Sequence, residues 1–154
     1  MPMKSLAGPQ EARLLVDRLR HVTPQSVRRW GRMTPLEMVC HLADAYRHAM
    51  GEIAASPVDT LFSRNVVKRV ALWLPVRWPP GYPTRPEVDP QRAGRKPGDF
   101  LRDRDQVETD LYRFIDAIHR GTMARHSIFG PMSAREWLRW GWLHADHHLR
   151  QFSQ

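Results

Sequence analysis

The sequence predicts an all-α fold, a four-helix bundle with one additional helix and a long proline-rich loop in the crossover. Three observations predict it. Helix start and stop signals divide the 154 residues into five helical stretches. Apolar residues recur in those stretches at helical spacing, and no segment alternates with period two for long enough to form a strand. With 42% hydrophobic residues the chain can bury one core, so residues 1–154 are expected to form a single domain.

The first two helices have clear boundaries. A helix over residues 8–21 is predicted between a Gly-Pro and a Thr-Pro pair. A second is predicted over residues 34–50, because Thr34 can cap its free amides, a proline occupies its first position and Glu37 can complete a capping box. Gly51 follows, and glycine is favourable at the left-handed C-terminal position.

A third helix is predicted over residues 57–74, followed by a loop over residues 75–98. The apolar residues of the helix are Leu61, Phe62, Val66, Val67, Val70 and Leu74. The loop holds seven prolines and three glycines. Loops of this length are functional or mobile, and because prolines stiffen the chain we expect an ordered wrap that covers the mouth of the bundle.

The last two helices are also delimited by caps. Asp99 can begin a helix over residues 99–120 that Gly121 ends, and its apolar residues recur at spacings typical of a bundle seam. Ser133 and Glu136 form a second capping box, which opens a helix that continues to the end of the chain.

The final helix carries a candidate metal-binding pair. On a helical wheel His144 and His148 share one face, opposite Arg139, Asp146 and Arg150, which we take as the solvent face. Two imidazoles one turn apart can bind one ion, and unpaired buried polar groups are costly, so a metal between them is favoured. Catalytic zinc-type centres need a third protein ligand.

His41, on the helix over residues 34–50, is the candidate third ligand. Glu37 and Asp44 flank it on the same face and are expected to accept its second ring proton. His48 shares that face, and the choice of proton acceptor among Glu37, Asp44 and His48 stays open. A nitrogen-rich site suits zinc or nickel, and the sequence does not decide between them.

The remaining histidines and the only cysteine have simpler interpretations. An isolated histidine is most often a hydrogen-bonded core residue, and we expect this of His21, His48, His119 and His126. His147 falls to the side of the metal-facing pair. Cys40 is expected in the core, and a single cysteine excludes an internal disulfide framework.

The net charge of +8 suggests a polyanion partner, but no nucleic-acid motif accompanies it. A solvated basic face is the favoured interpretation, and nucleic acid is a disfavoured partner. No apolar run is long enough to span a membrane and no secretory signal is visible, so we expect a cytoplasmic protein.

Two segments resemble a known family. They are Trp30-Gly-Arg-Met-Thr-Pro-Leu-Glu-Met-Val-Cys-His41-Leu, and His126-Ser-Ile-Phe-Gly-Pro-Met-Ser-Ala-Arg-Glu-Trp137 followed by His144-Ala-Asp-His-His-Leu-Arg-Gln151. Both resemble the DinB/YfiT-like superfamily of metal-dependent enzymes, in a branch of unassigned function that ends in His-His-Leu-Arg-Gln. The resemblance implies a four-helix bundle and a divalent ion held by three histidines, here His41, His144 and His148. Ser127 departs from the branch pattern, which has proline there, and puts the turn before the last helix in question.

The leading hypothesis is therefore a metal-dependent hydrolase or thiol transferase acting on a small-molecule substrate. An anionic substrate is expected because the loop over residues 75–98 carries arginines. The alternative is a non-catalytic binding or structural protein whose ion only braces the bundle. The protein could also form a homodimer.

Overall fold

The computed structural model describes residues 3–153. Within them every element of regular secondary structure is a helix, and there is no strand. The α-helices are α1 (Pro9–Arg20), α2 (Pro35–Ala49), α3 (Lys68–Trp73), α4 (Phe100–Arg120) and α5 (Ala134–Gln151). A π-helical turn, η1 (Ser63–Val67), leads into α3, and a 3-10 turn, η2 (Pro86–Val88), lies in the long loop. The prediction of an all-α fold is confirmed.

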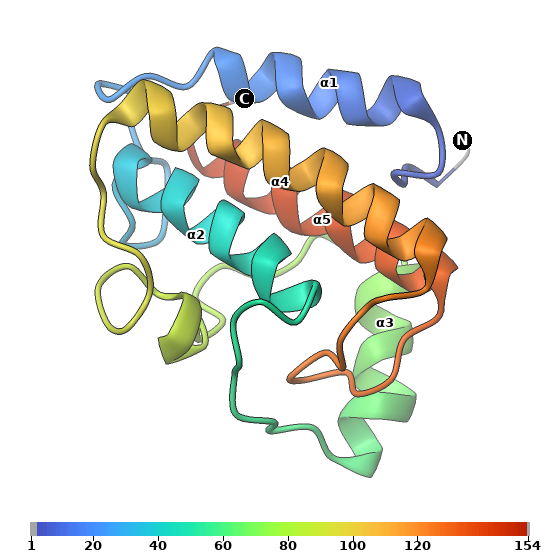
Figure 1. Cartoon of the computed structure of the whole chain (residues 1–154). Coiled ribbons are helices and arrows are strands. Elements are labelled where there is room, and N and C mark those ends of the chain that lie inside the picture. Colours follow the sequence, from blue (N-terminus) through green and yellow to red (C-terminus); the bar gives the residue numbers. More distant parts are fainter. Residues whose placement is uncertain (1–2, 154) are drawn as a thin grey trace.

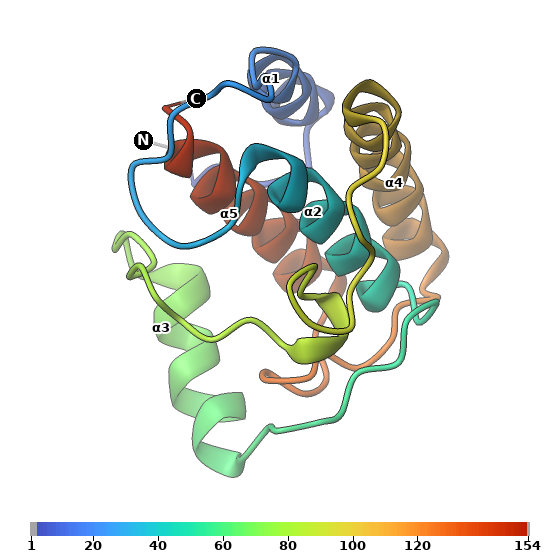
Figure 2. The ribbon, with the colours of Figure 1, turned by 90° about the vertical axis from the view of Figure 1, so that its left-hand side faces the viewer.

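The four longer helices pack side by side, and α3 lies apart from them against α5 (Figures 1 and 2). Their shared core is large and aromatic: Tyr46, Phe114, Trp137 and Leu149 are fully buried within it. None of the helices in residues 3–153 combines the length and the apolar character of a membrane span.

The predicted helix caps are present. Thr34 and Ser133 each begin a capping box with the glutamate three residues later, and the Asp99 side chain accepts a hydrogen bond from the Arg102 amide. Gly121 ends α4 with a φ of 71°, a left-handed conformation that glycine adopts without steric cost.

The third helix begins later than predicted. Residues 54–60 have no regular secondary structure, and Thr60 and Ser63 then exchange hydrogen bonds between their amides and hydroxyls. Most of its predicted apolar residues do not enter the core: Leu61 is 75% exposed and Phe62 is 65% exposed, whereas Leu72 is fully buried. The reason is that α3 stands away from the four packed helices, so most of this apolar face borders a cavity instead of a neighbouring helix.

The predicted solvent face of α5 is also wrong. Arg139 is buried, where it donates hydrogen bonds to the carbonyl oxygens of Leu72 and Lys4. Asp146 pairs with Arg18 of α1 at 2.8 Å. Helix α5 is therefore covered on this side by α1 and by the segment before it, which a helical wheel of α5 alone does not reveal.

The loop over residues 75–98 is an ordered wrap, as the prolines predicted. Trp78 donates a hydrogen bond to the Ala71 carbonyl at 2.8 Å, which fastens the start of the loop to α3. Val88 and Asp89 are buried against α2. At Gly94 a Cβ atom would lie 2.7 Å from the Asp89 backbone, so only glycine permits this close return of the chain.

Candidate metal centre

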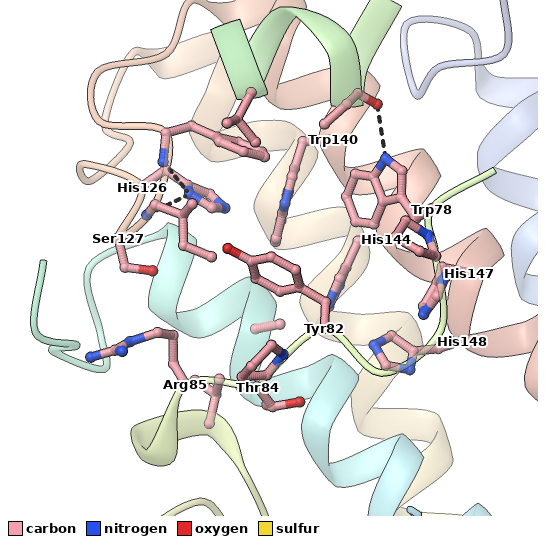
Figure 3. A pocket seen from close by; sticks show the side chains of 18 of the residues that line it. Trp78, Tyr82, Thr84, Arg85, His126, Ser127, Trp140, His144, His147 and His148 are labelled. Carbon is pink, nitrogen blue, oxygen red and sulfur yellow. Dashed lines mark hydrogen bonds between the residues drawn. The ribbon is translucent and has the colours of Figure 1, made fainter. Parts of the chain in front are cut away.

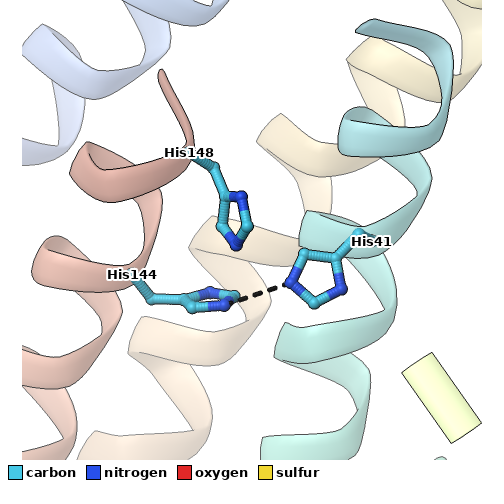
Figure 4. A group of neighbouring side chains, drawn as sticks. All are labelled: His41, His144 and His148. Atoms are coloured by element: carbon cyan, nitrogen blue, oxygen red, sulfur yellow. Dashed lines mark hydrogen bonds between the residues drawn. The ribbon is translucent and has the colours of Figure 1, made fainter. Parts of the chain in front are cut away.

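Three histidines from two helices converge on one point. His41 comes from α2, and His144 and His148 come from α5 (Figure 4). Their candidate ligand atoms all lie within 4.8 Å of one another, and the Nε2 atoms of His41 and His144 are 3.2 Å apart. Among residues 3–153, these three side chains are close enough together to hold one metal ion.

Hydrogen bonds fix the tautomers of two of the rings. Nδ1 of His41 lies 2.8 Å from the Val88 carbonyl oxygen, and Nδ1 of His148 lies 2.7 Å from Oε1 of Gln151. Because both oxygens can only accept, each Nδ1 carries the proton and each Nε2 presents a lone pair to the shared point. The prediction that Glu37 or Asp44 would accept the second proton of His41 is wrong, since a backbone carbonyl of the loop takes that place.

His144 is positioned by stacking. Its ring lies parallel to that of Trp140, with 4.9 Å between the centroids and 10° between the planes. Its Nδ1 is buried without a hydrogen-bond partner.

Burial keeps the three rings neutral. Removal from water lowers the pKa of His144 and His148 well below the usual value, and the neighbouring histidines lower it further. Desolvation also lowers the pKa of His41. Neutral imidazole is the form that binds a metal ion, so the donor set fits the ion that the sequence predicts.

The candidate proton acceptors lie in three different settings. Glu37 accepts hydrogen bonds from the Thr34 amide and from Gln91, in the capping box of α2. Asp44 is buried and accepts from the Arg95 amide at 2.8 Å. Of the three, only His48 borders the cavity that the candidate metal ligands also line.

That cavity has a volume of about 520 Å³ (Figure 3). Its walls are mainly apolar side chains of η1, α3 and the loop, namely Phe62, Val66, Val67, Val70, Ala71, Val76, Trp78 and Tyr82. Its polar residues include six histidines, Arg77 and Arg85, and none of the described residues that line it is acidic. Such a cavity suits an apolar ligand with few polar groups and no positive charge.

Two cavity histidines were not predicted as part of the site. His126 is buried and hydrogen-bonded, as expected of a core histidine, but it lines the cavity. His147 also lines it, beside Trp78. Neither has a sequence signal, because the loops that complete the cavity come from distant parts of the chain.

Of the remaining residues with a sequence prediction, some lie as predicted and some do not. His21 and His119 are exposed, so their prediction as core residues was wrong. Cys40 is buried as predicted, and burial raises the pKa of its thiol to about 11. Ser127 does not disturb its turn, because His126 and Gly130 exchange both backbone hydrogen bonds, at 3.0 and 2.9 Å.

Comparison with known proteins identifies the family. A family model described as "Protein of unknown function (DUF1569)" matches residues 10–154, and the chain belongs to this family. No curated protein and no solved structure matches it.

Proposed function

We propose that this protein is a metal-dependent hydrolase or thiol transferase, built as a four-helix bundle of the DinB/YfiT-like type. The DUF1569 family lies in that superfamily. The observation that carries the proposal is the convergence of His41, His144 and His148, with the lone pairs of His41 and His148 directed at the shared point. Zinc or nickel is the proposed ion, because both accept nitrogen-rich sites.

A divalent ion on three neutral imidazoles lowers the pKa of a water or thiol that it binds, which supplies a nucleophile near neutral pH. The chain supplies the surroundings. Mainly apolar side chains surround the candidate metal centre, which strengthens electrostatic interactions beside it. The Val88 carbonyl and Gln151 hold two of the rings in orientation.

Charge in the cavity supports an anionic small-molecule substrate. Arg77 and Arg85 both border the cavity, and no acidic side chain among its described residues opposes them. Arg85 is partly occupied, since it donates to the Ser56 carbonyl and lies 3.8 Å from Glu87. Arg77 is exposed and is therefore the proposed residue that attracts the anion.

The bracing alternative is less well supported. An ion that only braces a bundle needs no access from solvent, whereas these ligands border a cavity of about 520 Å³. A ligand position open to that cavity is the arrangement of catalytic centres, and structural sites are closed.

Elemental analysis of the purified protein tests the metal site. We expect about one divalent ion per chain, its loss in His144→Ala, and its retention in His21→Ala, which removes an exposed histidine instead. X-ray absorption should then show three histidine nitrogen ligands and at least one oxygen ligand from exchangeable water. Full occupancy in His144→Ala would refute the site, and a saturated protein-only shell would refute catalysis in favour of bracing.

A further inference from the structure

The cavity has a second polar region away from the metal ligands. His126 and Ser127 lie across the cavity from His147 and His148, and the Trp140 ring lies between (Figure 3). The Trp140 centroid is 5.4 Å from that of His126 and 4.9 Å from that of His144. Trp140 thus separates His126 from the metal ligands.

His48 belongs to the same cavity but not to the metal centre. It follows His41 on α2 by seven residues, a rise of about 10 Å along the helix axis. The backbone amide of Ala124, two residues before His126, donates to the carbonyl of Ala49, the residue after His48, at 2.9 Å, so the two segments lie side by side, and both rings line the cavity. His48 and His126 therefore form a pair of their own.

The tautomer of His126 is fixed by its turn. The amides of Ile128 and Phe129 both donate to Nδ1 of His126, each at 3.1 Å. Nδ1 is therefore an acceptor, and the proton of the neutral ring is on Nε2. No residue among 3–153 accepts a hydrogen bond from this Nε2. The ring also stacks on Phe129, with 4.6 Å between centroids, so its direction is fixed.

The tautomer of His48 is the opposite one. Its Nδ1 lies 2.8 Å from the Ile53 carbonyl oxygen, which can only accept, so Nδ1 carries the proton. Its Nε2 is then a bare acceptor, and it is buried without a partner. A buried acceptor without a partner is costly, which points to a ligand group that supplies the missing hydrogen.

We propose that His48 and His126 form a hydroxyl-binding subsite, in which His126 Nε2–H donates to the ligand oxygen and His48 Nε2 accepts the hydroxyl hydrogen. A hydroxyl is the small group whose single oxygen both donates and accepts. The apolar walls between the two regions favour an apolar part of the ligand between its hydroxyl and the group at the metal centre. This inference rests on the proposed function in one respect: the hydroxyl belongs to the substrate of the metal centre.

Two simple molecules test the subsite without any metal. Hexan-1-ol offers a donor and an acceptor, whereas hexyl methyl ether, of the same alkyl chain, offers only an acceptor. Each is titrated into chelator-treated full-length chain labelled with ¹⁵N-histidine, and binding is followed by NMR at the His48 and His126 ring nitrogens. We expect the proton of His126 on Nε2, that of His48 on Nδ1, and binding of the alcohol about fivefold tighter than the ether.

Asparagine variants separate the two hydrogen bonds while keeping the structural ones. In His48→Asn the amide NH₂ still donates to Ile53, but the acceptor is lost, so the alcohol should lose its preference over the ether. In His126→Asn the amide oxygen still accepts from Ile128 and Phe129, but the donor is lost, so both molecules should bind about fivefold more weakly. His21→Asn, a change at an exposed histidine, should alter neither.

Equal binding of alcohol and ether to the wild type, a preference that survives in His48→Asn, or a His126 proton on Nδ1 would each overturn the subsite. Cobalt uptake by the same variants reports separately on the metal centre. Loss of that uptake in the wild type would refute the proposed function and leave the alcohol titrations valid.

Discussion

His126 should make the folded protein sensitive to acid, and His126→Asn should relieve this sensitivity. The pKa of His126 is lowered to about 3, mainly by burial and also by the charges of His48 and Lys68, which Asp59 opposes. Protonation of Nδ1 would also break its two hydrogen bonds with backbone amides. The folded state therefore holds this ring neutral.

The magnitude follows from proton linkage. In the unfolded chain His126 takes up a proton below pH 6.5, but in the folded chain it does so only near pH 3. Stability is therefore lost as the pH falls through this interval, at about 1.4 kcal/mol per pH unit. At pH 5 the loss from this one ring is about 2 kcal/mol, which corresponds to about 4–8 °C in Tm for a chain of this size.

Urea unfolding of the metal-free wild type, His126→Asn and His21→Asn at pH 7, 6 and 5 measures this effect. Other buried histidines contribute equally to all three proteins, so the comparison isolates His126. We expect the wild type and His21→Asn to lose about 2 kcal/mol more than His126→Asn between pH 7 and pH 5. Parallel curves for all three proteins would refute the reasoning.

Three further predictions concern the core, the cysteine and a helix cap. Gly141→Ala should destabilise the protein by about 1–2 kcal/mol in urea unfolding, because the new Cβ would lie 2.5 Å from the Phe114 ring. This overpacking exceeds the gain of about 1 kcal/mol in helix propensity, so a more stable variant would contradict the prediction. Cys40 should not react with Ellman's reagent at pH 8 in the native protein but should react fully in guanidinium, because the thiol is buried and burial raises its pKa to about 11. Rapid labelling of the native protein would show that the thiol is accessible. Thr34→Ala should lower the free energy of unfolding by about 1 kcal/mol in the same urea assay, because the Glu37 amide loses its side-chain acceptor. Unchanged stability would mean that water replaces this hydrogen bond.

Much of the fold was predictable because its signals are local. Thr34, Ser133 and Asp99 mark helix starts through hydrogen bonds that reach only three residues along the chain. The pairing of His144 with His148 follows from helical geometry alone. His41 could be predicted as a candidate third ligand because it lies on a helix that begins with a capping box, and the structure brings it to His144 and His148.

The sequence by itself determined the four longer helices, their caps and the two helical faces that carry the histidines, because these depend on neighbours within one or two turns. The tertiary structure decided everything that involves a second segment. It placed the Val88 carbonyl, and not a carboxylate, behind His41, and it covered the charged side of α5 with α1. It also left the apolar face of α3 to line a cavity and brought His126 to it, since long-range packing, and not periodicity, determines which side chains share a space.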